Sequence, residues 1–588
     1  MKSVRFHKSP LLAIQLPAWR SRLVLCVLFV AFIALLLRAI WLQGVSTEFL
    51  QTKGESRYAT TLKMPATRGK IVDRNGALLA SSVPAWAIIA HPEDIEASRA
   101  DVENLARALD LPVADVQKKL SDKVHNFVYL KRQVTPQAAE AIAKMDLPGI
   151  EKRKEYRRNY PQNDAMAHVV GFTNIEDAGQ EGIELAWQQA LAGQPGSRRV
   201  IRNRLGQPII EDPGGTRIPH DGHDLVLSID SNIQFIAFNQ LKAAVDTYRA
   251  HAGAIVVIDV QTGEVLALAN LPSYNPNDRG VLSGEQLRNR VLTDTYEPGS
   301  TLKPFTIALA LDRGVVKPDT IVQTAPGKLT IGTATISDSH AHGALTVEEI
   351  IKVSSNIGTA KVGLRMQPQQ MWEMYTAAGF GQAPKWGFPG AVAGRLRPYK
   401  RWRPIEQATM SYGYGLSVSL IQIARAYTMF ARDGEIIPLT FFKSASGNDR
   451  NAATRVHGTQ VISPRVAREM RHMLEMAAGP GGTAPKAQVM GYRVAGKTGT
   501  AHKLSLTGRN YDGNRYVGSF VGFAPVSNPR IVVAVMIDEP STGIYYGGDV
   551  AAPVFSAVVG GTLRALGVEP DSSVKSLIIP ADPLKETL

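Results

Sequence analysis

Residues 297–305 read Glu-Pro-Gly-Ser-Thr-Leu-Lys-Pro-Phe, and this stretch decides how the rest of the chain is interpreted. A turn at Pro298-Gly299 is followed by a helical pattern over 300–313. Ser300 and Lys303 are three residues apart and therefore share a helix face. The helix amino terminus favours negative charge, and burial would lower the pKa of Lys303, so the pair can supply a nucleophile and its base.

Two more motifs follow in order along the chain, and each is informative only together with the secondary structure predicted around it. They are Ser354-Ser355-Asn356, between two helical patterns, and Lys497-Thr498-Gly499. The patterns Ser-x-x-Lys and Ser-x-Asn recur elsewhere, at Ser572, Ser273 and Ser446. Only around Ser354 do flanking helices predict a hydroxyl and an amide held rigidly toward a cleft. The order and setting of the three motifs therefore matter more than any one of them.

A nucleotide-binding loop is the rival interpretation of the third motif. Residues 491–498 fit the pattern G-x4-G-K-T, and IVVID at 255–259 resembles the aspartate-ended strand that accompanies such loops. A membrane-anchored ATPase would require a helix directly after the loop, with its amino terminus facing phosphate. The residues after Lys497 contain three glycines and no helical period, so the sequence predicts a strand there and the nucleotide function is rejected.

On a strand, the third motif has a different chemistry. Lys497 with the hydroxyls of Thr498 and Thr500 can bind a carboxylate, and Gly499 lets a ligand approach the backbone closely. The backbone amides of Ser300 and Thr500 are predicted to form an oxyanion pocket, in which losing one donor typically costs ~10²–10³ in rate.

The amino-terminal region predicts a membrane anchor. Residues 23–42 are apolar and would span ~30 Å as a helix, with Arg38 near one end able to extend to the interface beside Trp41. Basic residues precede this run and no acidic residue occurs before Glu48, which predicts a cytoplasmic amino terminus and an external remainder. A cleaved signal peptide is the alternative, but the full spanning length and the lack of a small-x-small cleavage site favour an uncleaved anchor.

Composition excludes some partners and leaves others open. The net charge of +14 comes without an aromatic-basic module or a zinc-ligand cluster, which argues against a nucleic-acid partner and fits an anionic membrane surface. The single cysteine, Cys26, can form no internal disulfide, so it does not reveal the redox compartment.

A chain of 588 residues requires more than one domain, and changes in composition along the chain suggest the boundaries. A Pro/Gly-rich stretch over 211–222 separates a charge-rich part from one with long regular elements. The predicted order is a cytoplasmic tail, a transmembrane helix, a non-catalytic pedestal domain, a catalytic domain and a carboxy-terminal tail, over 1–22, 23–42, 43–220, 221–570 and 571–588.

The catalytic part is predicted to be an antiparallel sheet packed with helices. Asp230 or Ser231 caps a helix, and two apolar runs flank Gln261-Thr262-Gly263, a link so short that it permits only antiparallel pairing. SFVGFAP and IVVAVMID are further strand candidates. Helical patterns follow at 346–365, 417–432, 464–477 and 551–566. In the pedestal, Arg74-Asn75-Gly76 predicts a tight hairpin turn.

Several motifs together resemble the class B penicillin-binding proteins: Arg288-Asn289-Arg290, residues 297–305, Ser354 to Gly358, Ser411 to Ser417, and Lys497 to Ala501. With Arg68-Gly69 through Asn75-Gly76 and Gly182-Ile183-Glu184, the resemblance covers nearly the whole chain and is closest to the division-specific peptidoglycan D,D-transpeptidases. The second motif has Ser355 where the pattern of related enzymes has Asp. The hydroxyl of Ser354 and the side-chain amide of Asn356 match the pattern, so only the middle residue differs.

The resemblance implies an α+β fold of the penicillin-binding and serine β-lactamase type, after one transmembrane helix and an elongated pedestal of the dimerisation type. It implies that Ser300 attacks D-Ala-D-Ala and that an amine of a neighbouring stem peptide resolves the acyl-enzyme. Lys303 would be the acylation base, the assignment most disputed in related enzymes. Ser354 would relay the proton, Asn356 would bind the substrate amide and position Lys303, and Lys497, Thr498, Gly499 and Thr500 would bind the substrate.

The resemblance also implies partners and a location. The substrates would be peptidoglycan stem peptides, β-lactams would acylate the same serine, and the enzyme would lie in the inner membrane with its catalytic domain in the periplasm. A membrane-embedded glycosyltransferase and other divisome proteins would be its partners, and no cofactor or metal is implied. His340 and His342 have no nearby partner that completes a metal set. The alternatives are an elongation-specific paralogue, and a β-lactam sensor or inactive scaffold.

Overall fold

The computed structural model describes residues 17–45, 59–122, 124–202, 208–211, 216–278, 280, 282–384, 386–444, 456–504 and 511–573. The Ser446 repeat, Lys575, Glu48 and the first basic residues of the leader lie outside the described residues, as do residues 574–588 of the predicted tail. The chain divides into two compact units, residues 1–66 with 194–220 and residues 67–193 with 221–588.

The first unit contains the apolar helix. Helix α1 (Ala18–Ile40) runs into the short π-helix η2 (Trp41–Val45), and residues 18–44 are long and apolar enough to cross a membrane. The guanidinium of Arg38 lies 4.7 Å from the ring centroid of Trp41. Strands β1 (Ala59–Met64), β6 (Gly196–Arg202) and β7 (Pro208–Glu211) form an antiparallel sheet in the order β1-β6-β7.

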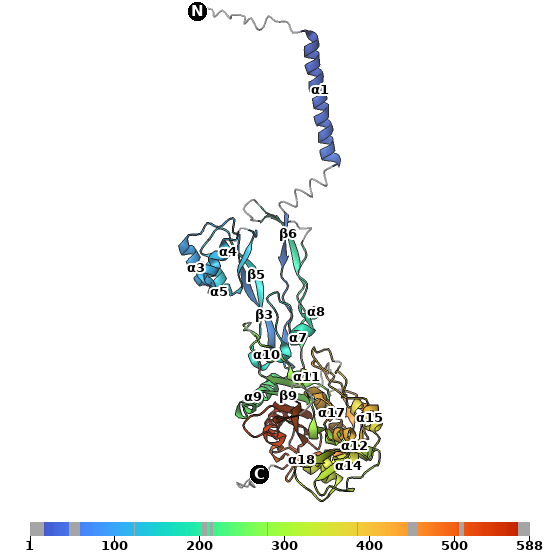
Figure 1. The fold of residues 1–588 in the computed structure, drawn as a ribbon. Coiled ribbons are helices and arrows are strands. Elements are labelled where there is room, and N and C mark those ends of the chain that lie inside the picture. The colour runs from blue at the N-terminus through green and yellow to red at the C-terminus, as the bar shows by residue number, and fades with distance from the viewer. Residues whose placement is uncertain are drawn as a thin grey trace, which may run out of the picture. The chain divides into compact units, whose positions relative to one another are not determined.

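The second unit begins with the rest of the pedestal (Figure 1). Strand β3 (Leu78–Ala90) pairs with β2 (Ile71–Val72), β4 (Val128–Val134) and β5 (Ile150–Asn159), all antiparallel. The predicted turn at Arg74-Asn75-Gly76 joins β2 to β3 and is confirmed. Strand β2 also pairs with β8 (Leu225–Val226) in parallel, so the pedestal sheet includes a strand that lies about 150 residues further along the chain.

Helices complete the pedestal. Helices α3 (Arg99–Leu109), α4 (Val113–Leu120) and α5 (Pro136–Ala143) bury Leu105, Leu109, Val116 and Ile142 against Ile88 and Leu130 of the sheet. Shorter helices follow: η3 (Asn163–Ala165), α6 (Ala167–Val170), α7 (Gly182–Ala186) and α8 (Gln188–Leu191).

A buried ion triad joins two motifs of the pedestal that are far apart in sequence. Glu184 accepts hydrogen bonds from Nε of Arg68 at 2.5 Å and from Nε of Arg158 at 2.6 Å, and all three side chains are fully buried. A second nitrogen of Arg68 donates to the Glu184 carbonyl at 2.8 Å. Because breaking such a buried set strands a charge, these residues hold β2, β5 and α7 in one arrangement.

The catalytic part is built on a five-stranded antiparallel sheet in the order β10-β9-β21-β20-β19. Its strands are β9 (Ala252–Asp259), β10 (Val265–Leu271), β19 (Ala495–Leu504), β20 (Tyr511–Ala524) and β21 (Ile531–Asp538). Strands β9, β10 and β21 are buried along their whole length, so both faces of the sheet are covered. The predicted antiparallel pairing around Gln261-Thr262-Gly263 is confirmed.

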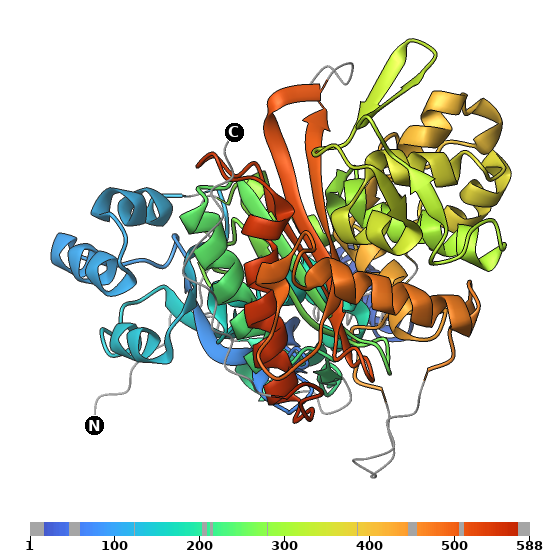
Figure 2. The same ribbon diagram turned by 90° about the horizontal axis from the view of Figure 1, so that it is seen from below.

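Alternate residues of each strand serve two separate cores. Ile255 and Val257 face helices α9 (Ser231–Thr247) and α20 (Ala552–Ala565), which lie against each other on one face of the sheet (Figure 2). Val256 and Ile258 face the core that includes α12 (Lys303–Asp312), α17 (Leu420–Ala431) and α18 (Pro464–Ala478). Asp230 caps α9 through the amides of Asn232 and Ile233, as its sequence predicted.

The remaining elements of the catalytic part lie between β10 and β19 or follow β21. Helices are α10 (Gly284–Leu287), α11 (Arg290–Thr293), η5 (Gly299–Leu302), α13 (Val347–Val353), α14 (Asn356–Gly363), α15 (Pro368–Ala377), η6 (Tyr399–Arg401), α16 (Pro404–Ser411), η7 (Pro485–Ala487) and α19 (Gly547–Val550). Strands are β11 (Thr295–Tyr296), β12 (Ile321–Gln323), β13 (Lys328–Ile331), β14 (Ala334–Ser337), β15 (Ala344–Thr346), β16 (Val418–Ser419), β17 (Glu435–Ile436) and β18 (Thr459–Gln460). The α+β architecture agrees with the sequence, but the pattern over 346–365 is two helices that break at Ser354.

Candidate active site

Ser300 lies in η5, a single turn of 3-10 helix that leads into α12. In this geometry residues i and i+3 eclipse one another, so Ser300 and Lys303 align more closely than in an α-helix. The turn is held by a loop from far along the chain: the Gly299 amide donates to the Gly413 carbonyl at 3.1 Å, and the Gly415 amide donates to Glu297 at 2.7 Å. A Cβ at Gly413 would lie 2.0 Å from the Gly299 carbonyl oxygen, so only glycine permits this approach.

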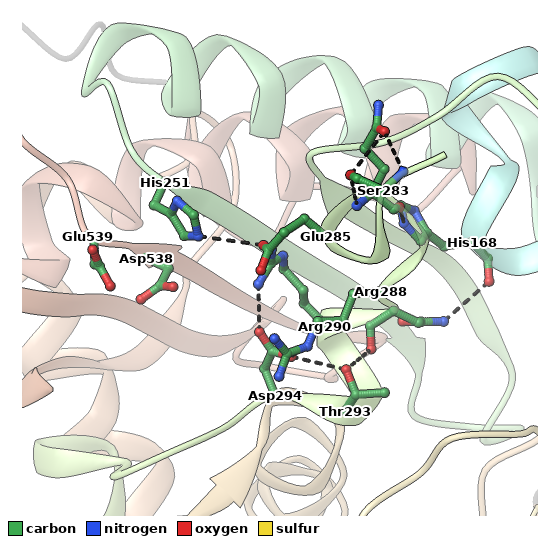
Figure 3. A network of polar contacts seen from close by, with 12 residues as sticks. His168, His251, Ser283, Glu285, Arg288, Arg290, Thr293, Asp294, Asp538 and Glu539 are labelled. Carbon is green, nitrogen blue, oxygen red and sulfur yellow. Dashed lines mark hydrogen bonds and ion pairs between the residues drawn. The ribbon is translucent and has the colours of Figure 1, made fainter. Parts of the chain in front are cut away.

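The segment before Ser300 is anchored by a buried arginine. The guanidinium of Arg290 lies between the carboxylates of Glu285 and Asp294, at 2.9 Å from the latter (Figure 3). Asn289 donates to the backbone carbonyl of His168 in the pedestal at 3.2 Å, and Asn270 donates to Asn289 at 3.0 Å. These contacts fix α11, from which only β11 and the turn separate Ser300.

Lys303 is fully buried and contacts the second motif directly. Its Nζ donates to the Ser354 carbonyl and, at 3.1 Å, to the Ser354 hydroxyl. Burial lowers the pKa of Lys303 well below its ordinary value, and the charge of Lys497 lowers it further, whereas Asp338 acts in the opposite direction. A lowered pKa favours the neutral amine, which is the form that can accept a proton from a serine hydroxyl.

Ser354 holds this position through a strained backbone. It ends α13 with φ of 62°, in the left-handed region that non-glycine residues seldom adopt. Such a conformation costs ~1–3 kcal/mol and persists only where the surroundings enforce it. Ser355 then caps α14, since its hydroxyl accepts from the Gly358 amide at 2.9 Å.

Asp338 enforces the Ser354 conformation and was missed by sequence reasoning. Its carboxylate accepts hydrogen bonds from the Ser355 hydroxyl at 2.6 Å, from the Asn356 amide and, at 3.0 Å, from the Ile357 amide. It follows β14, in the loop that also holds His340 and His342. The described residues contain no group of three or more potential metal ligands.

The side chain of Asn356 forms its hydrogen bond away from Lys303, and its predicted role in positioning Lys303 stays a prediction. Its side-chain amide donates to the Ser337 carbonyl at 2.9 Å, so in this structure it ties α14 to β14. No hydrogen bond between it and Lys303 occurs among the described residues. The carboxamide oxygen keeps its capacity to accept a hydrogen bond from a ligand.

Lys497 lies on β19, the edge strand of the main sheet, and is fully buried. Its Nζ lies 3.2 Å from Oγ1 of Thr498 and 3.4 Å from Oγ1 of Thr483, and the Thr498 hydroxyl donates to Thr483 at 3.0 Å. Burial lowers the pKa of Lys497 to about 7. Thr483 precedes η7 and carried no motif that could have revealed it.

Gly499 and Thr500 face the nucleophile turn. A Cβ at Gly499 would lie 2.5 Å from Oγ of Ser519, 2.9 Å from the Thr301 methyl and 3.0 Å from the Pro298 carbonyl oxygen. The glycine therefore lets the protein's own turn approach β19, which sequence reasoning had assigned to a ligand. The Thr500 carbonyl oxygen lies 3.5 Å from the Cβ position of Gly299, and the Thr500 hydroxyl accepts from the Gly547 amide at 3.0 Å.

The recurring motifs elsewhere do not share this environment. Ser273 donates to the Asp164 carbonyl at 2.8 Å, and the Ser572 amide donates to the Gly491 carbonyl at 3.1 Å. The ATPase interpretation remains rejected, because Lys497 belongs to the ten-residue strand β19, and the next described element is strand β20, not the helix that a nucleotide-binding loop requires.

Family models match both parts of this architecture. The model for the penicillin binding protein transpeptidase domain matches residues 253–560, and that for the penicillin-binding protein dimerisation domain matches residues 63–227. The chain therefore belongs to the class B penicillin-binding proteins, in which a transpeptidase domain follows a dimerisation domain.

Individual relatives support this membership over most of the chain. The chain is 43% identical to the probable peptidoglycan D,D-transpeptidase PenA of Neisseria gonorrhoeae over 554 residues, which cover 94% of this chain and 93% of PenA. It is 40% identical to the peptidoglycan D,D-transpeptidase FtsI of Escherichia coli (strain K12) over 561 residues, with 94% and 93% covered. The apo structure of the TP domain from Burkholderia pseudomallei penicillin-binding protein 3 is 56% identical with a TM-score of 0.53, and covers 59% of this chain and 98% of that one.

Replacing Asp338 with Asn should slow acylation of the site without touching any group that reacts. The variant keeps the shape but loses the charge and an acceptor at the α14 cap, and hydrogen bonds to a charged group contribute ~1.5–3 kcal/mol each. We expect the second-order rate of acylation by a fluorescent penicillin to fall at least about tenfold. Because Asp338 raises the pKa of Lys303, the acid limb of the rate profile should also move to lower pH. Asp319→Asn, the same change at an exposed position, is the control, and an unchanged rate in Asp338→Asn would contradict this role for Asp338.

Proposed function

We propose that this chain is a peptidoglycan D,D-transpeptidase that forms a serine acyl-enzyme at Ser300. The observation that carries the proposal is the buried, desolvated Lys303, one turn from Ser300 and hydrogen-bonded to Ser354. A buried lysine with no carboxylate partner among the described residues is costly to a fold, so it points to a chemical function. The printed names of the relatives describe the same activity in those proteins.

In the proposed acylation, Ser300 Oγ attacks the carbonyl carbon of the penultimate D-Ala of a stem peptide. Its proton passes to Lys303 Nζ, and the new C–O bond gives a tetrahedral oxyanion held by the amides of Ser300 and Thr500. The C–N bond then breaks, and the proton returns through the Ser354 hydroxyl to the departing amine of the last D-Ala. Hydrogen bonds from Lys303 to Ser354 support this relay.

The second half of the reaction restores the enzyme. An amine of a neighbouring stem peptide attacks the ester carbonyl, gives up a proton along the same route, and leaves as an amide while Ser300 regains its proton. The terminal carboxylate of the donor is bound by Lys497 and Thr498, with Thr500 beside it and Gly499 keeping the strand close to the turn. Asn356 is proposed to receive the substrate amide. β-Lactams present an acyl carbon and a carboxylate in the same relation and would acylate Ser300.

The cellular role follows from the relatives and the anchor. We propose that the helix over 18–44 holds the protein in the inner membrane, with the amino terminus inside and the pedestal and catalytic domain in the periplasm. We further propose that it works in septal synthesis beside a membrane-embedded glycosyltransferase and other divisome proteins. An elongation-specific role is the second candidate, because the same fold and site would serve it.

The serine assignment is tested by two serine variants. Wild type should form a covalent adduct with a fluorescent penicillin that survives denaturing gel electrophoresis, and Ser300→Ala should form none. Ser572→Ala, which removes the other Ser-x-x-Lys serine, should label as well as wild type because the buried lysines of the described residues, Lys303 and Lys497, belong to the Ser300 site. Labelling that survives in Ser300→Ala would disprove the proposed nucleophile.

The acylation rate should show a bell-shaped dependence on pH. As the pH falls, Lys303 takes up a proton and can no longer act as a base, so the rate declines on the acid side. As the pH rises through about 7, the free enzyme's Lys497 loses the charge that binds the carboxylate, so the rate declines on the alkaline side. In Lys497→Arg the guanidinium stays charged, and the alkaline limb should move upward even if the maximum is lower. An alkaline limb that stays in place would assign that ionisation to another group.

The septal role is tested by depletion of the protein in its own organism. Loss of a division enzyme blocks septation while elongation continues, so the cells should become filaments. Depletion that yields rounded cells of near-normal volume would instead support the elongation-specific role, with the chemistry at Ser300 unchanged.

A further inference from the structure

A cavity of about 670 Å³ lies at the carboxy-terminal end of α18. It is lined by that end of the helix, by residues 488–494 ahead of β19, and by Lys352 of α13. The residues of the three catalytic motifs do not line it. Its volume falls within the ~300–1,000 Å³ of typical ligand pockets, so it can hold several side chains.

Part of the cavity lining is apolar. Met476 contributes from α18, and Val489, Met490 and Val494 contribute from the segment before β19. Met490 is 60% exposed. Because methionine has three rotatable side-chain bonds, it can adapt its shape to a bound segment. This surface therefore fits an apolar occupant.

The charged residues of the lining are net positive. Arg493 is bound by the two carboxylate oxygens of Glu475 at 2.6 and 2.7 Å, so these two charges compensate each other. Lys352 has no carboxylate partner in the described part of the chain, and neither has His472. A carboxylate beside the apolar surface would therefore complement the charge of the cavity.

The chain itself leads to this cavity. The Ser572 amide donates to the Gly491 carbonyl at 3.1 Å, and Asp571 accepts from the Arg493 amide at 2.7 Å. Ser572 and Ser573, at the end of the described part, both line the cavity. These hydrogen bonds fix the point from which the following residues continue.

The residues that follow match the cavity in composition. Residues 574–588 begin Val-Lys-Ser-Leu-Ile-Ile-Pro. Leu577 is the first of three consecutive apolar residues, and Asp582 is the first acidic residue after them. At no more than ~3.6 Å per residue, Leu577 lies within ~14 Å of Ser573 in the cavity lining. An apolar run and a carboxylate are thus within reach of the surfaces that they complement.

We propose that the cavity is the docking site of the chain's own carboxy-terminal segment, with residues 577–579 against the apolar surface and Asp582 beside Lys352. A short linker favours this occupant, because it gives an effective concentration of ~1 mM. A site with a Kd of ~0.1 mM would then be filled about ten times as often as it is empty. The inference does not depend on the proposed chemistry at Ser300.

The docked segment would contact parts of the chain that lead into the serine site. Lys352 precedes Ser354 by two residues, and Val494 precedes Lys497 by three. Docking therefore gives the carboxy-terminal segment a structural connection to two of the three catalytic motifs.

The test measures hydrogen–deuterium exchange in the full-length protein in detergent, resolved to single amides by fragmentation. The amides of residues 577–579 should exchange at least about tenfold more slowly than in an isolated peptide of residues 571–588. This protection should be independent of protein concentration, because docking is intramolecular. Exchange at the rate of the isolated peptide would overturn the proposal. Protection that is lost on dilution would also overturn it, since the occupant would then be the segment of a second copy.

A charge placed in the apolar lining should release the segment. Met490→Lys should lower the protection of residues 577–579 at least about fivefold, and Met490→Leu, which keeps an apolar side chain, should retain it. Phe235→Lys, the same kind of change at a residue of α9 that is 57% exposed, is the matched control and should behave as wild type does. Equal protection in Met490→Lys and in wild type, or equal loss in Phe235→Lys, would rule out docking in this cavity.

A second pair of variants tests which part of the segment docks. Ile578→Asp should remove the protection of the neighbouring amides, because a charge cannot replace an apolar side chain in the cavity. Leu584→Asp, the same type of change outside the apolar run, should leave the protection in place. Equal effects of the two variants would contradict docking through residues 577–579.

Discussion

Two buried lysines in one site, Lys303 and Lys497, are the constraint on which the rest of the catalytic domain depends. Each positive charge placed there costs several kcal/mol unless a negative group compensates it. No carboxylate pairs with either Nζ within the described part of the chain. The site is therefore electrostatically incomplete until a substrate brings its own carboxylate, and one lysine must remain neutral even then, which makes it available as a base.

The buried site is held together by close contacts between segments that are distant in sequence. The turn at Ser300 contacts Gly413 on one side and Gly499 of β19 on the other. Both approaches are so close that a side chain at either glycine would clash. Asp338 holds Ser354 in its strained backbone from a third direction. The geometry of the nucleophile thus results from packing between segments that are up to 200 residues apart, so small changes far from Ser300 can alter its reactivity.

Much of this could be predicted from the sequence, because it is encoded locally. Motif spacing placed Ser300 beside Lys303, apolar runs around a short link predicted the antiparallel pair β9–β10, and glycines after Lys497 ruled out a nucleotide loop. Asp338 and Thr483 could not be found, since a lone acid or hydroxyl in a loop gains meaning only from partners brought in by folding. The same reason hid the hydrogen bond that Asn356 makes, because its partner, the Ser337 carbonyl, is a backbone atom that no motif specifies.

The parallel pairing of β2 with β8 has a consequence for biogenesis. Ile71 lies opposite Leu225, about 150 residues later in the chain. Synthesis from the amino terminus produces β2 well before β8, so the pedestal sheet stays unfinished until residues 225–226 have been made. Completion of the sheet therefore waits for a segment made much later, and a fragment ending near residue 220 would retain an open edge that invites aggregation.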